Sequence, residues 1–322
     1  MAAVEASPSL RALLGGSVDY AGLFPPAALA LEPALDNYAA YLRSEEAWML
    51  GRFVLPVAKF AEAGRLLDGR FDADRPLQIS ALGAKTGSAQ EFLEGLRADL
   101  RALADLQAQH GPAVAIEQLE APLPPDTAPG PALISLLREA AAILEADTHG
   151  SLRAFWEVPF SDSLPMLLCG FAEHNASAAR PCGAKLRTGG LEAAAFPSPE
   201  RLAFALIAAR HSGVALKFTA GLHHPFRRFD AGVGTRMHGF INVLAAGVFL
   251  RQPQTGAIAT LVQDILEDED PANFRFGADG LRWREWTVPT PAITEARALV
   301  TSFGSCSFDE PRDDLRAVGL LP

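Results

Sequence analysis

The chain has 322 residues, of which 49% are hydrophobic and 20% are charged, and its formal net charge at neutral pH is −10. This composition is typical of a folded chain with a large core. The acidic balance argues against nucleic-acid binding, which relies on clustered lysine and arginine. No apolar run reaches the ~20 residues that cross a bilayer, and no secretory signal is visible at the N-terminus, so a cytoplasmic protein without membrane contact is expected. The three cysteines, Cys169, Cys182 and Cys306, form no disulfide or metal pattern and indicate reduced thiols.

Short apolar runs typical of strands alternate along the chain with longer amphipathic stretches typical of helices. Seven such runs are present, at residues 17–24, 51–58, 77–84, 113–120, 153–160, 183–190 and 214–221. Each is followed by a helical pattern, and this alternation predicts parallel strands joined by right-handed crossovers. One helix also has clear boundary signals, because Ser198 and Pro199 precede its apolar positions and Gly213 follows them.

Two architectures fit this alternation, an open doubly wound sheet and a closed (β/α)8 barrel. The turn after the first predicted strand, DYAGLFPPAAL at 19–29, lacks the glycine fingerprint of doubly wound nucleotide folds. Seven or eight units fit a barrel, which needs roughly 250 residues plus insertions. We therefore predict one TIM-like barrel domain over residues 1–322, with a C-terminal extension around 274–322. Residues 274–283 are the candidate for the eighth strand, although their central GADG is also typical of a hairpin turn.

Function in such a barrel lies at the C-terminal ends of the strands. The polar residues expected there are Asp19, Tyr20, Lys59, Glu117, Glu120, Glu157, Lys185, Arg187, Lys217 and Thr219. Within AKLRTGG and LKFTAG, polar and apolar residues alternate, so Lys185 and Lys217 point inward on consecutive strands. A lysine beside a second cation loses part of its preference for the protonated state, and its neutral amine can form a Schiff base with a carbonyl.

This pair of segments resembles class I aldolases of the deoxyribose-phosphate aldolase type. That family has a lysine in a KTSTG-like strand end and a second lysine in a KASGG-like segment on the next strand, and the segments here are KLRTGG and KFTAGL. The resemblance implies that Lys185 forms the imine and that Lys217 lowers its pKa. Over most of its length the chain also resembles a group of bacterial proteins without an established function that share the RTGG, TAGLHHP and MHGF signatures, and this second resemblance implies no reaction.

The leading hypothesis is a cofactor-independent lyase or isomerase that acts on a small anionic carbonyl compound. Glu157 and one of the two residues His223 and His224 are expected to transfer protons, since imidazole titrates near neutral pH. Substrate contacts are predicted for the remaining polar residues near the strand ends: Asp19, Arg187, Thr188, Thr219, Arg227, His238 and Asn242. Cys306 is interpreted as a small packed residue outside this ring.

Three other interpretations remain open. The two lysines could be structural partners of nearby carboxylates such as Glu157. A divalent-metal enzyme could use Asp19, Glu117, Glu157 and one of the paired histidines, although no metal-binding motif is present. A non-catalytic barrel could bind an anionic metabolite through Arg187. A homodimer is compatible with each of these interpretations.

Overall fold

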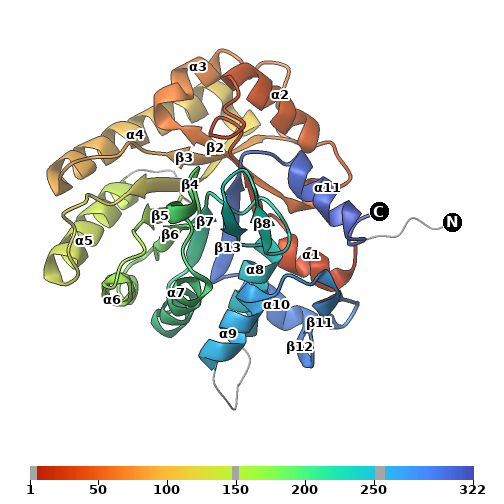
Figure 1. The fold of residues 1–322 in the computed structure, drawn as a ribbon. Helices are drawn as coiled ribbons and strands as arrows, with labels where there is room; N and C mark the ends of the chain where they lie inside the picture. The colour runs from red at the N-terminus through yellow and green to blue at the C-terminus, as the bar shows by residue number, and fades with distance from the viewer. Residues whose placement is uncertain (1–5, 147–151, 251–257) are drawn as a thin grey trace.

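The computed structural model describes residues 6–146, 152–250 and 258–322. Eight parallel strands close into a barrel in the order β1-β13-β7-β6-β5-β4-β3-β2. They are β1 (Val18–Tyr20), β2 (Leu50–Pro56), β3 (Leu77–Leu82), β4 (Val114–Pro122), β5 (Arg153–Glu157), β6 (Gly183–Arg187), β7 (Leu216–Thr219) and β13 (Val300–Ser305). The barrel and seven of the predicted strands are thereby confirmed. The chain runs around the barrel in sequence order, as the colours in Figure 1 show.

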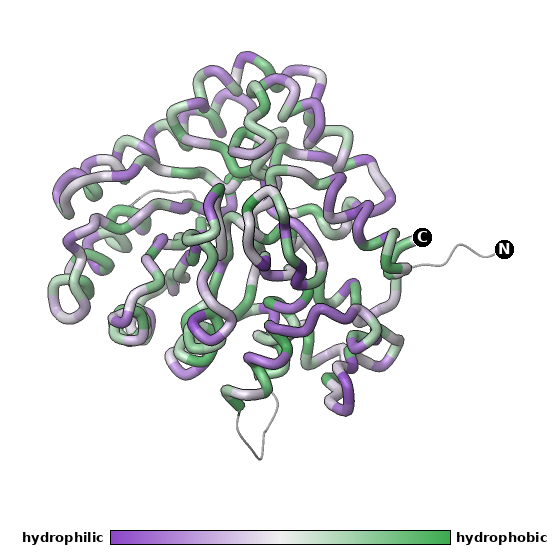
Figure 2. Tube along the Cα trace, viewed as in Figure 1, coloured by the Kyte–Doolittle hydropathy of each residue, from purple (hydrophilic) through white to green (hydrophobic). Residues whose placement is uncertain are grey.

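Helices surround the strands (Figure 1). They are α1 (Pro8–Leu14), α2 (Leu31–Tyr41), α3 (Phe60–Gly64), α4 (Ala89–His110), α5 (Pro131–Ala146), α6 (Leu164–Asn175), α7 (Pro199–Ser212), α8 (Phe240–Phe249), α9 (Ile258–Glu267), α10 (Thr290–Ala296) and α11 (Asp309–Ala317). Short 3-10 turns lie at Ala47–Met49, Val57–Lys59, Gly111–Ala113, Ala193–Ala195 and Pro271–Asn273. Hydrophobic and hydrophilic residues alternate along the outer helices in Figure 2, as expected when one face of each packs on the barrel.

Helix α7 follows the boundary signals in its sequence. The Ser198 side chain accepts a hydrogen bond from the backbone N–H of Arg201, and Pro199 occupies the first turn. At the other end Gly213 adopts the left-handed conformation, with φ of 64°, and its N–H bonds the last carbonyls of the helix. The predicted start and stop of this helix are confirmed.

The position predicted for the eighth strand is wrong. Residues 274–289 form a separate antiparallel sheet of β10 (Phe274–Phe276), β11 (Gly280–Trp283) and β12 (Trp286–Pro289), with GADG in the first hairpin. The strand that closes the barrel is β13, which pairs with β1 on one side and with β7 on the other. A further hairpin, β8 (Arg228–Asp230) with β9 (Thr235–Met237), follows β7 and lies in front of the barrel strands in the view of Figure 1.

Charged side chains occupy much of the barrel interior. A TIM barrel is usually filled with layers of branched apolar side chains, and here the Phe155 ring provides part of such a layer. It fits because its neighbour on β6 is Gly183, where a Cβ would lie 2.4 Å from the ring. Beyond this ring along β6 the inward position is Lys185, which is buried. Within the described ranges, no helix is both long and apolar enough to cross a membrane.

Candidate active site

A cavity of about 640 Å³ lies at the C-terminal ends of the barrel strands. Its polar wall includes six residues of the predicted site together with Glu120, and apolar residues form much of the remainder. The lining residues are Ala21, Phe24, Pro25, Pro26, Val54, Leu82, Gly83, Lys85, Glu120, Pro122, Glu157, Lys185, Arg187, Gly190, Leu191, Lys217, Thr219, Ala220, Gly221, His223, Gly304 and Cys306. Loops after β6 and β7 cross closely at its edge, where a Cβ on Gly189 would lie 2.7 Å from Cα of Gly221. The cavity therefore lies where barrel enzymes bind their substrates.

The two predicted lysines are direct neighbours. Lys185 on β6 and Lys217 on β7 are paired in register, and both side chains point into the barrel. The Nζ atom of Lys217 lies 2.5 Å from a carboxylate oxygen of Asp19 and 2.6 Å from one of Glu120. It also donates to the side-chain oxygen of Gln118 at 2.9 Å. An ammonium group has three N–H donors, so these oxygens satisfy all the donors of Lys217.

Lys185 has fewer partners. Its Nζ atom lies 2.8 Å from Glu120 and 3.0 Å from Glu157, and these are its carboxylate contacts among the described residues. Its side chain is 4% exposed, compared with 1% for Lys217. Lys185 is therefore the lysine with a donor position left for a molecule in the cavity.

Glu120 on β4 was expected near the strand ends but was given no role, and the structure places it at the centre of the network. One carboxylate oxygen contacts Lys217 and the other contacts Lys185, and the Ser80 hydroxyl donates to the same carboxylate at 2.5 Å. Burial acts to raise the pKa of Glu120, but the two ammonium groups outweigh burial and lower it. The signal was present, because Glu120 is the last acidic residue of an apolar strand. Whether Glu120 or Glu117 faces the two lysines depends on a register shift between β3 and β4, and the sequence does not reveal this shift.

The expectation that Lys217 lowers the pKa of Lys185 is wrong for this structure. Burial acts in that direction, but the carboxylates of Glu120 and Glu157 outweigh it and raise the pKa of Lys185. The physical reason is the position of Glu120, which lies between the two ammonium groups and screens one from the other. Lys185 is consequently held as an ammonium group at the cavity wall.

Asp19 lies deeper in the barrel than predicted. It is fully buried, and the cavity lining does not include it. Its carboxylate accepts hydrogen bonds from the Ser302 hydroxyl and from the backbone N–H of Arg52, each at 2.7 Å, besides its contact with Lys217. Asp19 therefore positions Lys217 in this structure, and no direct substrate contact is available to it.

Charges of alternating sign run along the barrel interior. In order of contact they are Glu117, Arg52, Asp19, Lys217, Glu120, Lys185, Glu157 and Arg187. The members at the ends are partly exposed, whereas the four central side chains are at most 4% exposed. Each buried charge thus has neighbours of opposite sign, the arrangement that makes burial of charge tolerable.

Cationic groups lie at the open side of the cavity. Arg187 is 58% exposed, and its contact with Glu157 is long, at 3.8 Å. Nδ1 of His223 lies 3.1 Å from the Glu310 carboxylate of α11 and 4.0 Å from Sγ of Cys306. Burial acts to lower the pKa of His223, but the contacts with Cys306 and Glu310 raise it to about 9. Cys306 directly follows the eighth strand and lines the cavity, so its interpretation as a residue outside the ring is wrong.

Five of the predicted site residues make contacts away from the cavity. His224 lies 2.5 Å from the Asp314 carboxylate on α11, and the hydroxyl of Thr188 donates to the backbone oxygen of Ala220.

The remaining three residues, Arg227, His238 and Asn242, hold the loop after β7 in place. In this group Arg227 contacts Nδ1 of His238, Nε2 of His238 lies 2.7 Å from the Pro197 oxygen, and Asn242 accepts from the N–H of Arg227. Burial, the main cause, lowers the pKa of His238 to about 4. None of these five residues lines the cavity, so the proton transfer predicted for His224 and the substrate contacts predicted for the other four are not available in this geometry.

The carboxylates considered for a metal do not converge. Asp19 contacts Lys217, Glu117 contacts Arg52 at 2.6 Å, and Glu157 contacts Lys185. Throughout the described part of the chain, no three histidine, cysteine, aspartate or glutamate side chains are grouped as a metal site would require. The ligand set of the metal hypothesis is therefore not assembled.

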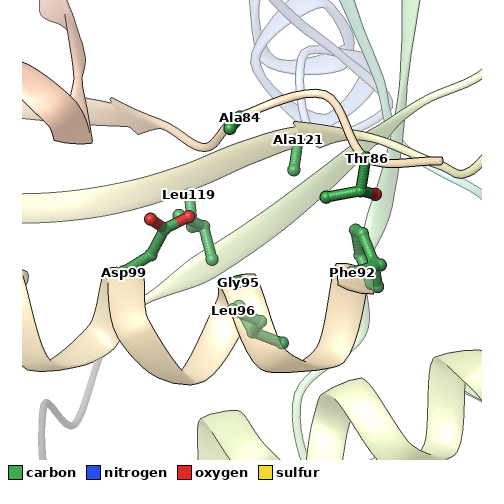
Figure 3. A pocket seen from close by; sticks show the side chains of 8 residues that line it. All are labelled: Ala84, Thr86, Phe92, Gly95, Leu96, Asp99, Leu119 and Ala121. Carbon is green, nitrogen blue, oxygen red and sulfur yellow. The ribbon is translucent and has the colours of Figure 1, made fainter. Parts of the chain in front are cut away.

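A second, much smaller cavity lies between α4 and the strands β3 and β4 (Figure 3). Its volume is about 30 Å³, and Phe92, Asp99 and Leu119 are among its lining residues. A water molecule needs ~10–15 Å³ of such space, so this cavity is too small for a substrate. Burial raises the pKa of Asp99 there to about 6.

Comparison with known proteins gives no family. No protein-family model and no curated protein matches the chain. Among solved structures, a GH6 enzyme of Orpinomyces sp. is similar, with a TM-score of 0.33 and 10% identity over 68% of this chain and 73% of that one. A likeness this low carries no argument about function, so function has to be inferred from the site itself.

Proposed function

We propose that the chain is a lyase or isomerase that forms a Schiff base between Lys185 and an anionic carbonyl compound. The observation that supports this most strongly is the unequal bonding of the two adjacent lysines at the cavity. Lys217 is saturated by Asp19, Glu120 and Gln118, whereas Lys185 keeps a donor position toward the cavity. A lysine in such a position can reach a carbonyl carbon while its neighbour stays fixed.

The first step requires the Lys185 ammonium to lose a proton. Glu157 is the acceptor in this proposal, because its carboxylate lies 3.0 Å away and borders the cavity. The neutral amine then attacks the carbonyl carbon and forms the C–N bond. Glu157 returns this proton to the former carbonyl oxygen and then relays one proton from the nitrogen to the resulting hydroxyl. The hydroxyl leaves as water, and the product is an iminium ion that keeps one N–H. The iminium accepts the electron pair when an adjacent C–C or C–H bond breaks.

The surrounding groups support the later steps of this chemistry. Of the two predicted histidines, His223 is the one that borders the cavity, and its raised pKa suits a general acid. The exposed guanidinium of Arg187 offers paired donors to a carboxylate or phosphate of the substrate. Glu120 and Asp19 keep Lys217 in place beside the imine.

Exchange of substrate protons in D2O tests this proposal. An enamine formed at Lys185 would replace the hydrogens on the carbon next to the carbonyl with deuterium, which proton NMR detects. We expect exchange in pyruvate, phenylpyruvate or 2-oxoglutarate with the wild type and none with Lys185→Arg. Exchange that persists in Lys185→Arg would assign the reaction to another residue. If the wild type instead binds these compounds and exchanges none, the chain is a binding protein and the proposal is wrong.

A further inference from the structure

The wall of the large cavity is divided by strand into two chemically different sides. The neighbouring strands β4, β5, β6 and β7 contribute the charged side chains Glu120, Glu157, Lys185 and Lys217, of which all but the partly exposed Glu157 are buried. The neighbouring strands β1, β2 and β3 contribute apolar groups from the strands themselves and from the loop after β1: Ala21, Phe24, Pro25, Pro26, Val54 and Leu82. The two sides face each other across the same cavity.

The boundary between the sides is sharp where β3 meets β4. Leu82 and Glu120 are paired in register on these strands, so an apolar and a charged side chain lie next to each other at one depth. Val54 on β2 continues the apolar side and is 6% exposed. Three lining residues depart from the pattern, Lys85 on the apolar side and Pro122 and Leu191 on the charged side, and of these Lys85 and Leu191 are exposed at the rim. The division therefore applies to the inner part of the cavity.

We infer that the substrate carries an apolar group, aromatic or branched aliphatic, next to its carbonyl and its anionic group. This inference rests on the proposed Schiff-base function and specifies its substrate class. An apolar group gains free energy when it leaves water for a wall of Phe24, Val54 and Leu82. Hydroxyl groups in the same place would lose their hydrogen bonds to water, because these side chains offer no donor or acceptor. The cavity volume of about 640 Å³ lies within the ~300–1,000 Å³ typical of ligand pockets.

Competitive trapping with two 2-oxo acids tests the apolar side. Phenylpyruvate and pyruvate share the carbonyl and the carboxylate and differ in an aromatic ring. Borohydride reduces the C=N bond of each imine to a stable secondary amine, so mass spectrometry gives the ratio of the two adducts on Lys185. A hydrophobic pocket discriminates by roughly tenfold or more for each methylene-sized group, and we expect at least about a tenfold preference for phenylpyruvate.

Two variants examine the origin of this preference. Leu82→Asn places a polar group in the wall, and Phe24→Ala removes a ring from the loop, where folding is less at risk. Each should lower the adduct ratio severalfold, whereas Phe204→Ala, at an exposed position on α7, should leave it unchanged. Equal trapping of both acids, or a preference that neither variant alters, would overturn the inference while the Schiff-base function stands. If neither acid is trapped on Lys185, the proposed function itself fails.

Discussion

Lys185 and Lys217 occupy equivalent positions on adjacent strands, but they differ in how many of their N–H donors are already bonded within the protein. Both lie in register on adjacent strands, but Lys217 contacts two carboxylates and an amide oxygen, whereas Lys185 contacts two carboxylates beside an open cavity. Buried ion pairs contribute little net stability compared with apolar residues of similar volume. Their presence in the barrel interior is therefore better explained by the chemistry of the site than by a need for stability.

The pH dependence of amine labelling tests the state of Lys185. Because Glu120 and Glu157 raise its pKa, Lys185 should react with a small amine reagent only at pH values above the ~10.4 of an ordinary lysine. Glu157→Gln removes one carboxylate, so its labelling curve should shift to lower pH. Mass spectrometry of the labelled peptides measures this shift, with the exposed Lys59 as internal reference. A wild-type curve below that of an ordinary lysine would show that the carboxylates do not control Lys185.

Replacement of Lys217 should strongly destabilise the fold. Lys217→Met keeps the length of the side chain but leaves the buried carboxylates of Asp19 and Glu120 without their shared counter-charge. Removal of one partner from a buried pair costs ~3–5 kcal/mol, and loss of an exposed pair costs ~0–1 kcal/mol. Denaturant unfolding should therefore separate this variant from Lys59→Met, which breaks the surface pair with Glu62. Similar losses in the two variants would contradict the account of the buried network.

At the scale of elements, helix α4 contains a carboxylate, Asp99, whose charged form is destabilised by burial. Its apolar positions Phe92, Leu96, Leu100 and Leu103 pack toward the barrel at helical spacing. Asp99 lies near this face and borders the small cavity of Figure 3. The folded protein favours its neutral form more than the unfolded chain does, because burial raises its pKa from 3.8 to about 6.

Asp99→Asn should therefore stabilise the protein in a pH-dependent way. The folded protein binds the proton more tightly than the unfolded chain, so the stability of the wild type falls as pH rises from about 4 to about 6 and stays low above that. Because Asp99 is partly solvated, we expect Asp99→Asn to increase the free energy of unfolding by about 1–2 kcal/mol at pH 7.5 and by much less near pH 4. Thermal unfolding at both pH values measures it, with Asp105→Asn on the exposed side of α4 as control. A gain of equal size at both pH values would contradict this cause.

At the scale of the whole molecule, local patterns predicted the barrel but not its closure. Seven strands have apolar runs, and each is followed by a helix, so their order was readable. The eighth, VTSFGS at 300–305, mixes hydroxyl and glycine residues and follows the inserted sheet of β10 to β12. The alternating residues 274–283 gave a stronger strand signal, but that signal came from a hairpin.

The part of the candidate site that depends on alternation within a strand was predictable from the sequence, and the part that depends on contacts between distant strands was not. Alternation on β6 and β7 placed Lys185 and Lys217 inward and next to each other. The depth of Asp19 could not be predicted, because its contact with Lys217 joins positions 198 residues apart and depends on how the barrel closes. The role of Glu120 was hidden for a related reason, since the register shift between β3 and β4 decides which acidic residue of β4 faces the lysines.

Mass-mapped borohydride trapping tests the central claim most directly. The wild type, Lys185→Arg and Lys217→Arg would each be reduced in the presence of phenylpyruvate, pyruvate and 2-oxoglutarate and then digested. The account predicts a secondary-amine adduct on the wild-type peptide that contains Lys185, its loss in Lys185→Arg, and no transfer of the adduct to the Lys217 peptide. An adduct on Lys217, or no adduct on either lysine with any of these compounds, would contradict it.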